Sequence, residues 1–485
     1  MIDTEAMRCK ILENALKGQI SDTLIADEDV ANLINLLRMQ KEECIKKGLI
    51  SKDKKALPIT EKETPFQIPA AWGWVRIGDI FYHNTGKALN SSNTEGNTYE
   101  YITTSNVYWD RFELNELKTM LFTESEIEKC TVKKGDLLVC EGGDIGRAAI
   151  WNFDEEIKIQ NHIHRLRPYV EICVRFYYYV FLYYKKIGRI NGKGIGLQGL
   201  STNVLHELIV PLPPRGIQWK IAEKIDEIFE QLEIIDELQR NYVADIKALK
   251  NKLFDVAVQG KLSEQLLEDG TAEELYTKIQ IEKTALMQEG KIKKEKVLPE
   301  ITEDEVPFDI PLNWKWVRLG DISAKISSGN TPAGGNKSNV YVEKGYSFFR
   351  EQNIYNDGIH EEGLVYITEE LLKTRVNSTV LPMDILLNIT GGSIGRCALI
   401  TDDFTKGSIN QHILIIRMID PRLRFYIHTC ICSPFIQKYI KGNTVGDKDG
   451  FSAGRCKNML IPLPPLEEQR RIVSKLNEIL AFVTM

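Results

Sequence analysis

The chain repeats itself, and this duplication constrains its fold more than any other feature. Residues 65–80 recur as residues 307–322, in the pattern Pro-Phe-x-Ile-Pro followed by Trp-x-Trp-Val-Arg-x-Gly-Asp-Ile. Further blocks match in the same order: 142–147 with 391–396, 161–163 with 411–413, and 209–214 with 460–465. Self-similarity over this length predicts two copies of one domain.

The likeness continues outside these blocks in a circular order. Residues 15–20 resemble residues 257–262, so that the two ends of the chain together match the central segment from 214 to 306. We therefore expect a circular, pseudo-twofold arrangement of a domain, a connector, a second domain, and a connector built from both termini.

The connectors have the apolar spacing of long helices. After Pro214, apolar residues follow mostly in alternating steps of three and four, ending before Gly260: Ile221, Ile225, Ile228, Leu232, Ile235, Leu238, Tyr242, Ile246, Leu249, Leu253 and Val256. This spacing predicts an antiparallel coiled coil, in which some 44 residues form a rod of roughly 65 Å. Further helices are expected from Thr271 to Gly290, with Thr271 and Glu274 as a capping box, and from about Asp27 to Gly48.

The segments between the connectors have the pattern of short strands and turns. We expect strands at 75–81, 99–106, 136–139, 148–151 and 157–166, and a helix over 174–187. The predicted fold class is α+β, with two repeated α/β domains separated by long antiparallel helices.

Composition excludes several classes of protein. The chain is 43% hydrophobic and 27% charged, which is ordinary for a globular protein and excludes disordered and fibrous classes. Its nine cysteines form no CxxC pair, which favours a reducing compartment. The strongest apolar run, Val174 to Tyr184, is too short to span a membrane.

The net charge of -6 conceals two basic zones. Residues 157–211 carry 8 basic and 2 acidic side chains, and residues 406–462 carry 9 and 3. Each zone contains a polar, glycine-rich loop, and such loops can approach a phosphate backbone and read base edges. The DNA-binding candidates are Arg189, Asn191, Lys193, Gln198 and Ser201 in the first loop and Lys441, Asn443, Lys448 and Ser452 in the second. A solvated loop that binds nothing is the alternative.

These blocks, their order and their duplication resemble the DNA-specificity subunit of type I restriction-modification systems, in the branch with long connectors and an N-terminal conserved segment. The resemblance covers nearly the whole chain. It implies an N-terminal helical segment (1–64), a first target-recognition domain (65–211), a central helical connector (212–306), a second recognition domain (307–462) and a C-terminal helix (463–485).

The resemblance also implies a division of labour. Each recognition domain would read one half of a split, asymmetric double-stranded DNA site, and the helices would set the spacing and dock two methyltransferase subunits. Restriction subunits with motor and nuclease activity are possible further partners. The chain itself would be non-catalytic and cytoplasmic, with S-adenosylmethionine, ATP and Mg²⁺ used by the partners.

Corresponding turns of the two copies differ in their side chains. Thr103 and Ser105 align with Arg350 and Gln352, so these four residues are further DNA-binding candidates that predict different bases for the two domains.

Other motifs have plainer interpretations. The Gly142–Gly146 and Gly391–Gly395 segments lack the endings of phosphate-binding loops and predict tight turns, and the arginines that follow, Arg147 and Arg396, would either brace a carboxylate or touch a phosphate. His162 and His412 are expected to be hydrogen-bonded core residues, and no metal site is predicted. The aromatic cluster at 176–184 predicts core packing, with base stacking as the lesser alternative.

We found no methyltransferase, nuclease, nucleotide-binding or serine-hydrolase motif. Two other functions remain open from the sequence: a structural adaptor whose basic zones bind protein, and an enzyme with an unrecognised site.

Overall fold

Each copy of the repeat is closed by a two-stranded ladder built from the two motifs at its ends. In the computed structural model, β1 (Gly73–Arg76) pairs antiparallel with β12 (Ile209–Leu212), so the Trp-x-Trp-Val-Arg block lies beside the Pro-Leu-Pro-Pro block. In the second copy, β13 (Lys315–Arg318) pairs in the same way with β24 (Leu460–Leu463). The most similar parts of the two copies therefore form the same structural element.

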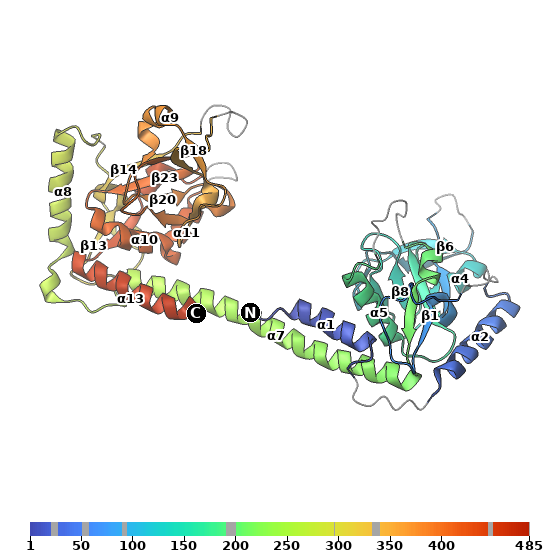
Figure 1. The fold of residues 1–485 in the computed structure, drawn as a ribbon. Helices are drawn as coiled ribbons and strands as arrows, with labels where there is room; N and C mark the ends of the chain where they lie inside the picture. The colour runs from blue at the N-terminus through green and yellow to red at the C-terminus, as the bar shows by residue number, and fades with distance from the viewer. Residues whose placement is uncertain are drawn as a thin grey trace. The chain divides into compact units, whose positions relative to one another are not determined.

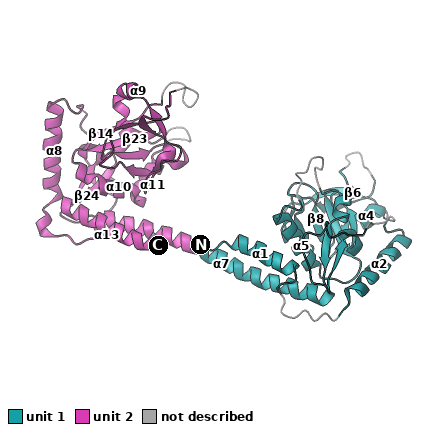
Figure 2. Cartoon of the chain, in the orientation of Figure 1, with its two compact units in different colours: residues 1–240 teal, residues 241–485 magenta. Residues whose placement is uncertain are grey.

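The structure describes residues 1–20, 28–50, 58–89, 95–190, 200–294, 296–331, 340–444 and 450–484. The chain divides into two compact units, residues 1–240 and 241–485, which we call unit 1 and unit 2 (Figure 2). None of the helices in these described ranges combines the length and apolar character needed to cross a membrane.

Two four-stranded sheets form the body of the described part of unit 1 (Figure 1). The first has the order β2-β11-β8-β9 and is antiparallel throughout; the second has the order β6-β3-β10-β7, in which β3 and β10 are parallel. The strands are β2 (Phe81–Thr85), β3 (Asn97–Ile102), β6 (Lys118–Phe122), β7 (Thr131–Val132), β8 (Leu137–Cys140), β9 (Ala148–Ile150), β10 (Ile157–Ile159) and β11 (Ile163–Pro168).

Unit 2 repeats this topology, because its sheets have the orders β14-β23-β20-β21 and β18-β15-β22-β19. The parallel pair recurs between β15 and β22. The strands are β14 (Ser323–Ser328), β15 (Tyr346–Phe349), β18 (Val365–Ile367), β19 (Thr379–Val380), β20 (Ile385–Asn388), β21 (Cys397–Leu399), β22 (Gly407–Ile409) and β23 (Ile413–Met418). The α+β class and the duplication predicted from the sequence are both confirmed.

The central strand β8 shows why the domain needs cover on both faces. All four of its residues are buried, with Leu137 and Val139 in the cluster around α5 (Val174–Lys186) and Leu138 and Cys140 in the cluster of the second sheet. Successive side chains of a strand point to opposite faces, so an apolar run of this kind requires a packed layer on each side. The α5 aromatics Phe176, Tyr177 and Tyr184 are fully buried, which confirms that the aromatic cluster is core.

The connector is a continuous helix, α7 (Arg215–Val258), of 44 residues, as its spacing predicted. In unit 1 it pairs with α1 (Thr4–Leu16): the Thr4 hydroxyl donates to Asp236, Arg8 forms an ion pair with Asp236 at 2.9 Å, and its guanidinium lies 5.8 Å from the ring of Phe229. Since later residues of α1 face earlier residues of α7, the two helices are antiparallel.

In unit 2 the C-terminal helix α13 (Leu466–Thr484) belongs to the same apolar cluster as the last turns of α7. Leu253 and Phe254 pack in this cluster with Ile472 and Leu476. Buried Glu468 fixes the start of α13, because it accepts the indole N–H of Trp314 at 2.9 Å.

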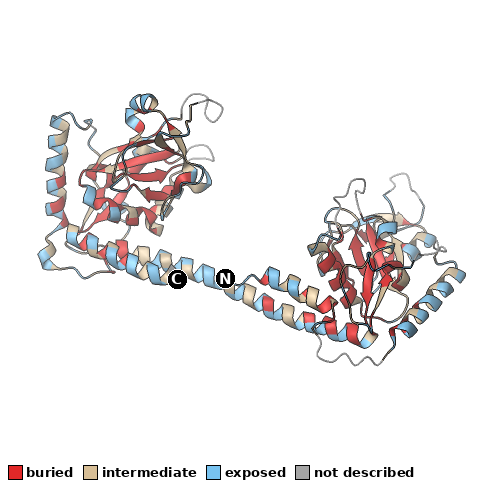
Figure 3. Cartoon of the chain, viewed as in Figure 1, coloured by how far each residue is buried: buried red, intermediate tan, exposed pale blue. Residues whose placement is uncertain are grey.

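The predicted apolar seam is only partly covered (Figure 3). Ile221, Ile225 and Leu232 are buried, whereas Leu238, Tyr242 and Leu249 are 62%, 58% and 45% exposed. The prediction that other helices of the same chain cover the apolar seam along the whole of α7 is therefore wrong. In unit 1 the reason is the length of α1, whose first turn already reaches Asp236.

Two further helices match their predicted positions. α2 (Val30–Lys46) begins after Asp29, whose carboxylate accepts the Ala31 amide, and α8 (Ala272–Gln288) begins after Thr271, whose hydroxyl accepts the Glu274 amide. Each is fixed to its own unit: Lys41 pairs with Asp79 at 3.0 Å, and Gln280 donates to the Asp321 carbonyl.

Two of the predicted strands are interrupted. The expected strand over 75–81 is broken by a helical turn, α3 (Ile77–Ile80), because the chain leaves the β1-β12 ladder there to enter the first sheet. The expected strand over 157–166 is broken at residues 160–162, because β10 and β11 belong to different sheets.

Candidate nucleic-acid interface

A tight turn with the Gly-x-Ile-Gly-Arg sequence lies at the centre of the candidate interface in each unit. In unit 1 the Gly146 amide donates to the Cys140 carbonyl at 2.9 Å, and Gly143 and Gly146 have φ of 69° and 82°. In unit 2 the Gly395 amide donates to the Asn388 carbonyl at 2.9 Å. These are the structural turns that the sequence predicted, since a left-handed φ favours glycine.

The arginine that ends each turn stacks on a tyrosine. The Arg147 guanidinium lies 5.0 Å from the ring of Tyr108, and that of Arg396 lies 4.5 Å from the ring of Tyr355. Arg147 also donates to the Thr104 carbonyl. Arg147 therefore braces a ring and a backbone carbonyl and Arg396 braces a ring, in place of the carboxylate that the sequence suggested as one alternative.

The tyrosines belong to short hairpins that occupy the same position in each unit. In unit 1 the hairpin is β4 (Val107–Tyr108) with β5 (Arg111–Phe112). In unit 2 it is β16 (Ile354–Tyr355) with β17 (Gly358–Ile359).

The turns just before these hairpins carry four of the sequence-predicted residues. In unit 1 the hydroxyls of Thr103 and Ser105 are 2.7 Å apart, and Ser105 is exposed. In unit 2 the Arg350 guanidinium donates to the Gly363 carbonyl, while Gln352 is exposed. Ser105 and Gln352 therefore present polar groups to solvent at equivalent places.

The first predicted loop is described only at its two ends. Arg189 is exposed, donates to the Glu63 carbonyl at 3.0 Å and lies over the ring of Tyr184. Ser201 stands at the start of α6 (Thr202–His206). Asn191, Lys193 and Gln198 lie outside the described residues.

The second predicted loop follows α11 (Pro434–Gly442) and leads into α12 (Ala453–Lys457). Lys441 is exposed, Asn443 donates its amide to the Tyr439 carbonyl at 2.9 Å, and the Ser452 hydroxyl accepts the Arg455 amide at 3.3 Å. Lys448 lies outside the described residues.

The central turn connects these segments. In unit 1 the Leu200 amide donates to the Glu141 carbonyl at 3.2 Å, and Arg147 reaches Thr104, so both predicted sets meet at residues 141–147. In unit 2 the Phe451 amide donates to the Ile389 carbonyl at 2.9 Å, and Asn388 donates to the Glu351 carbonyl at 2.8 Å. The central turn, the turn before the hairpin and the described ends of the loop together form what we call the interface cluster of each unit. It comprises residues 103–106, 141–147, 189–190 and 200–201 in unit 1, and 350–353, 388–396, 441–444 and 450–452 in unit 2.

Two histidines beside the central turn are more exposed than the sequence suggested. The His162 side chain is 55% exposed and lies 3.4 Å from Glu141, so its expected place in the core is wrong. His412 is partly buried and hydrogen-bonded to Thr390 at 2.7 Å. Both lie at the break between the two sheets, where the chain reverses at the surface. The Asn/Gln that precedes each histidine was the available sequence signal for an exposed turn.

A chain of three histidines supports the loop end in unit 1. His164 Nε2 lies 2.6 Å from the Leu200 carbonyl, His83 Nε2 lies 2.9 Å from His164 Nδ1, and His206 Nε2 lies 3.0 Å from His83 Nδ1. A carbonyl can only accept, so His164 donates from Nε2 to Leu200. With the proton on Nε2 of every ring, His83 donates to His164 Nδ1 and His206 donates to His83 Nδ1.

Burial keeps His83 and His164 neutral. It lowers the pKa of His83 to about 2, helped by repulsion from His164 and His206, and it also lowers the pKa of His164. In unit 2, Ile326 and Leu414 occupy the positions of His83 and His164, so this row of histidines belongs to unit 1 alone. Within the described residues, no group of three His, Cys, Asp or Glu side chains could hold a metal ion.

Duplicated mixed domains with paired polar turns and long connector helices define the class of this protein. The family model for the type I restriction modification DNA specificity domain matches residues 69–241 and again residues 311–484. The chain belongs to this family of specificity subunits and carries two target-recognition domains, and subunits of this kind are non-catalytic.

Two relatives are similar over nearly the whole chain. The type I restriction enzyme EcoAI specificity subunit of Escherichia coli is 26% identical over 545 residues, which cover 98% of this chain and 88% of the relative. The EcoEI specificity subunit of the same species is 25% identical over 540 residues, which cover 97% and 88%. A solved structure described as "Structural basis underlying complex assembly and conformational transition of the type I R-M system" has a TM-score of 0.53 and 19% identity, covering 87% of this chain and 93% of that one, and supports the fold.

Proposed function

We propose that each unit reads one half of a bipartite, asymmetric DNA site through its interface cluster. The observation that carries this proposal is that one scaffold presents different side chains at the same turn. Ser105 in unit 1 is replaced by Gln352 in unit 2, beside an Arg-Tyr pair that both units share. Gln can form paired hydrogen bonds with adenine, whereas a Ser hydroxyl is less selective, so the two units should prefer different bases.

The basic candidates would supply the sequence-independent part of binding. Arg189 and Lys441 are exposed at the ends of the two loops, where each could neutralise a phosphate. Arg189 donates to a backbone carbonyl, which does not neutralise its charge, and Lys441 is exposed to solvent. Both charges are therefore available to the duplex. Phosphate contacts would position each unit, and contacts to base edges would select the sequence.

The helices would set the distance between half-sites and bind partner subunits. α7 has neither glycine nor proline after Gly216, as a stiff spacer requires. Its exposed apolar side chains would dock two methyltransferase subunits: Leu238, Tyr242, Val243 and Leu249. S-adenosylmethionine, and ATP with Mg²⁺ where restriction subunits join, would be used by these partners in the cytoplasm.

The test is a selection from randomised duplexes with the full chain co-expressed with its methyltransferase partner. We expect one bipartite sequence to be retained, with affinity that falls as salt rises. Salt-independent indifference to DNA would instead indicate a structural adaptor. Methylation by the chain without partners would contradict its non-catalytic role.

A further inference from the structure

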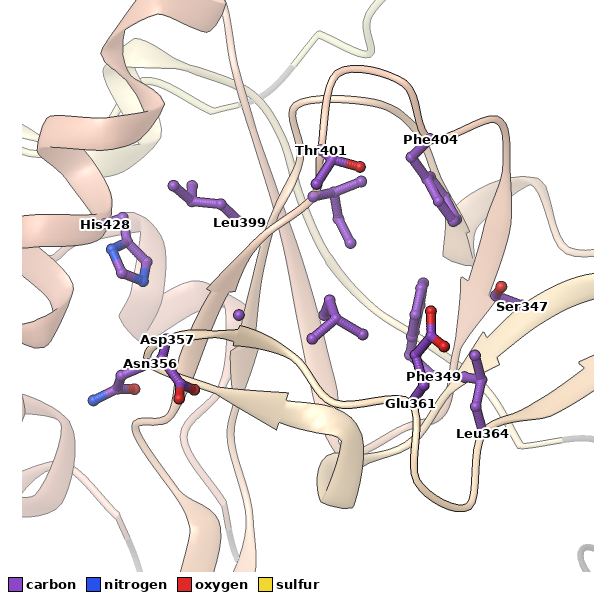
Figure 4. Close-up of a pocket in the computed structure, with 13 residues that line it drawn as sticks. Ser347, Phe349, Asn356, Asp357, Glu361, Leu364, Leu399, Thr401, Phe404 and His428 are labelled. Carbon is purple, nitrogen blue, oxygen red and sulfur yellow. The ribbon is translucent and has the colours of Figure 1, made fainter.

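A cavity of about 470 Å³ opens in unit 2 beside the β16-β17 hairpin (Figure 4). Its apolar wall includes Phe349, Ile359, Leu399 and Phe404, and its polar side includes Asn356, Asp357, Glu361 and His428. The volume is within the usual range for small-molecule sites.

Larger side chains occupy the corresponding positions of unit 1. The matched hairpins, strands and helices place Trp109 where unit 2 has Asn356, Tyr178 where it has His428, and Trp151 where it has Ile400. The rings of Trp109 and Tyr178 are 6.1 Å apart in an edge-to-face contact, and Trp151 packs on Phe112 at 4.9 Å. The cavity in unit 2 thus follows from the replacement of aromatic rings by smaller groups.

Unit 2 also lacks the ion pair that unit 1 forms at this place; its nearby Arg424 lies 4.2 Å from the ring of Phe425 and pairs with Asp402 instead. In unit 1, Arg175 forms an ion pair with Asp110. The corresponding residues of unit 2 are Phe425 and Asp357, so the carboxylate is kept and the arginine is lost. Asp357 is 3.1 Å from His360, with its own side chain 75% exposed.

The cavity lining offers hydrogen-bond acceptors and negative charge. Asp357 and Glu361 contribute carboxylates, and the lining residues include neither Lys nor Arg. His428 Nε2 donates to the Cys397 carbonyl at 2.9 Å, which leaves Nδ1 as an acceptor. Burial lowers the pKa of His428, so this ring does not add a competing positive charge.

We propose that this pocket binds a planar aromatic amine in its protonated form. The ring would occupy the volume that Trp109 and Trp151 fill in unit 1, against Phe349 and Phe404, whose centroids are 5.7 Å apart. The ammonium group would take the place of Arg175, beside Asp357 and Glu361. Aromatic faces and carboxylates both attract a cation, and the apolar wall favours a ring over an alkyl chain.

The test uses tryptamine as the probe and indole-3-acetate as its anionic match, with the full chain in saturation-transfer NMR and titration calorimetry. We expect millimolar or tighter binding of tryptamine, and binding of indole-3-acetate weaker by at least about fivefold. Equal binding of the two probes, or binding of neither, would overturn the proposal.

Variants of the pocket locate the site. Ile359→Phe introduces the residue of unit 1 and should abolish the tryptamine signal by filling the cavity. Glu361→Gln, a surface change that leaves the wall intact, should weaken binding by about threefold to fivefold. Glu362→Gln is the matched control, because this neighbouring carboxylate is exposed and does not line the cavity, and it should bind as the unaltered chain does. An unchanged affinity in both Ile359→Phe and Glu361→Gln would show that the probe binds elsewhere.

Discussion

Arg417 holds Asp384 through two parallel hydrogen bonds, from Nε to Oδ1 and from Nη2 to Oδ2, each 2.7 Å long. The same clamp recurs between Arg167 and Asp136, at 2.7 and 2.6 Å. Each aspartate also caps a turn, since Asp384 accepts the Leu381 amide and Asp136 the Lys133 amide. The clamp joins β11 to the turn before β8 in unit 1, and β23 to the turn before β20 in unit 2.

Arg417→Lys should destabilise unit 2 strongly. Lysine cannot form the paired contact, and Asp384 is fully buried, so one carboxylate oxygen would lose its hydrogen-bond donor. We expect the free energy of unfolding to fall by about 3 kcal/mol, measured by urea denaturation. The control is Arg422→Lys, whose partner is Asp420 but whose side chain is 57% exposed, and which should cost less than about 1 kcal/mol. Equal losses in the two variants would contradict this account of the clamp.

Gly18→Ala should loosen the junction between α1 and the first domain. Gly18 has a φ of 71°, and an added Cβ would lie 2.5 Å from Pro69 Cγ, so the change combines backbone strain with a clash. Gly48→Ala separates the two effects, because Gly48 has a φ of 73° but none of the residues that the structure describes lies within 4 Å of an added Cβ. We expect Gly48→Ala to cost about 1 kcal/mol and Gly18→Ala about 1–3 kcal/mol more, measured by thermal unfolding. A Gly18→Ala variant no less stable than Gly48→Ala would exclude the clash.

Acidification should weaken the end of the first loop. The pKa values of His83 and His164 are lowered in the folded chain, so the unfolded chain binds more protons below about pH 6.5. Stability that is present above pH 6.5 is therefore lost as the pH falls, by about 1.4 kcal/mol at pH 5.5 from His83, and His164 contributes a loss of the same sign.

Hydrogen exchange at pH 7.5 and 5.5, corrected for intrinsic rates, measures this loss. Amides of α6 should lose protection, whereas those of α12 in unit 2, which stands beside no such histidine chain, should not. His164→Leu introduces the residue found at Leu414 and should reduce the pH dependence. The same response in α6 and α12 would rule out the histidine chain as its cause.

Changes at the interface cluster should separate base reading from phosphate binding. Gln352→Ala should relax selection at one half-site by about 1–3 kcal/mol and leave the other unchanged, as measured on single-substituted duplexes. Lys441→Ala should weaken binding of all duplexes and reduce the salt slope by about one. Lys278→Ala, an exposed lysine of α8, is the matched control and should change neither.

The same assay tests two residues that the sequence alone nominates: Lys193→Ala should act like Lys441→Ala, and Gln198→Ala should relax the other half-site. Unchanged affinity and selectivity in all four variants would remove both loops and the Gln352 turn from the DNA interface.

Features set by local physics could be predicted closely from the sequence. α7 begins directly after Pro214 and α8 directly after Thr271, because helical spacing and capping depend on residues a few positions apart. The duplication itself predicted that both units share one fold. It also predicted the turns before Arg147 and Arg396, since a positive φ favours glycine and the glycines recur in both copies.

The tertiary structure decided what depends on distant partners. The parallel pairing of β3 with β10, the break between β10 and β11 and the exposure of His162 all follow from how two sheets meet, which no local spacing encodes. Periodicity marked Leu238 and Tyr242 as apolar positions of α7, but whether a partner covers them is a matter of packing. The sequence by itself therefore determined the elements and their duplication, while three-dimensional packing determined which side chains are left free to meet DNA, partner subunits or a ligand.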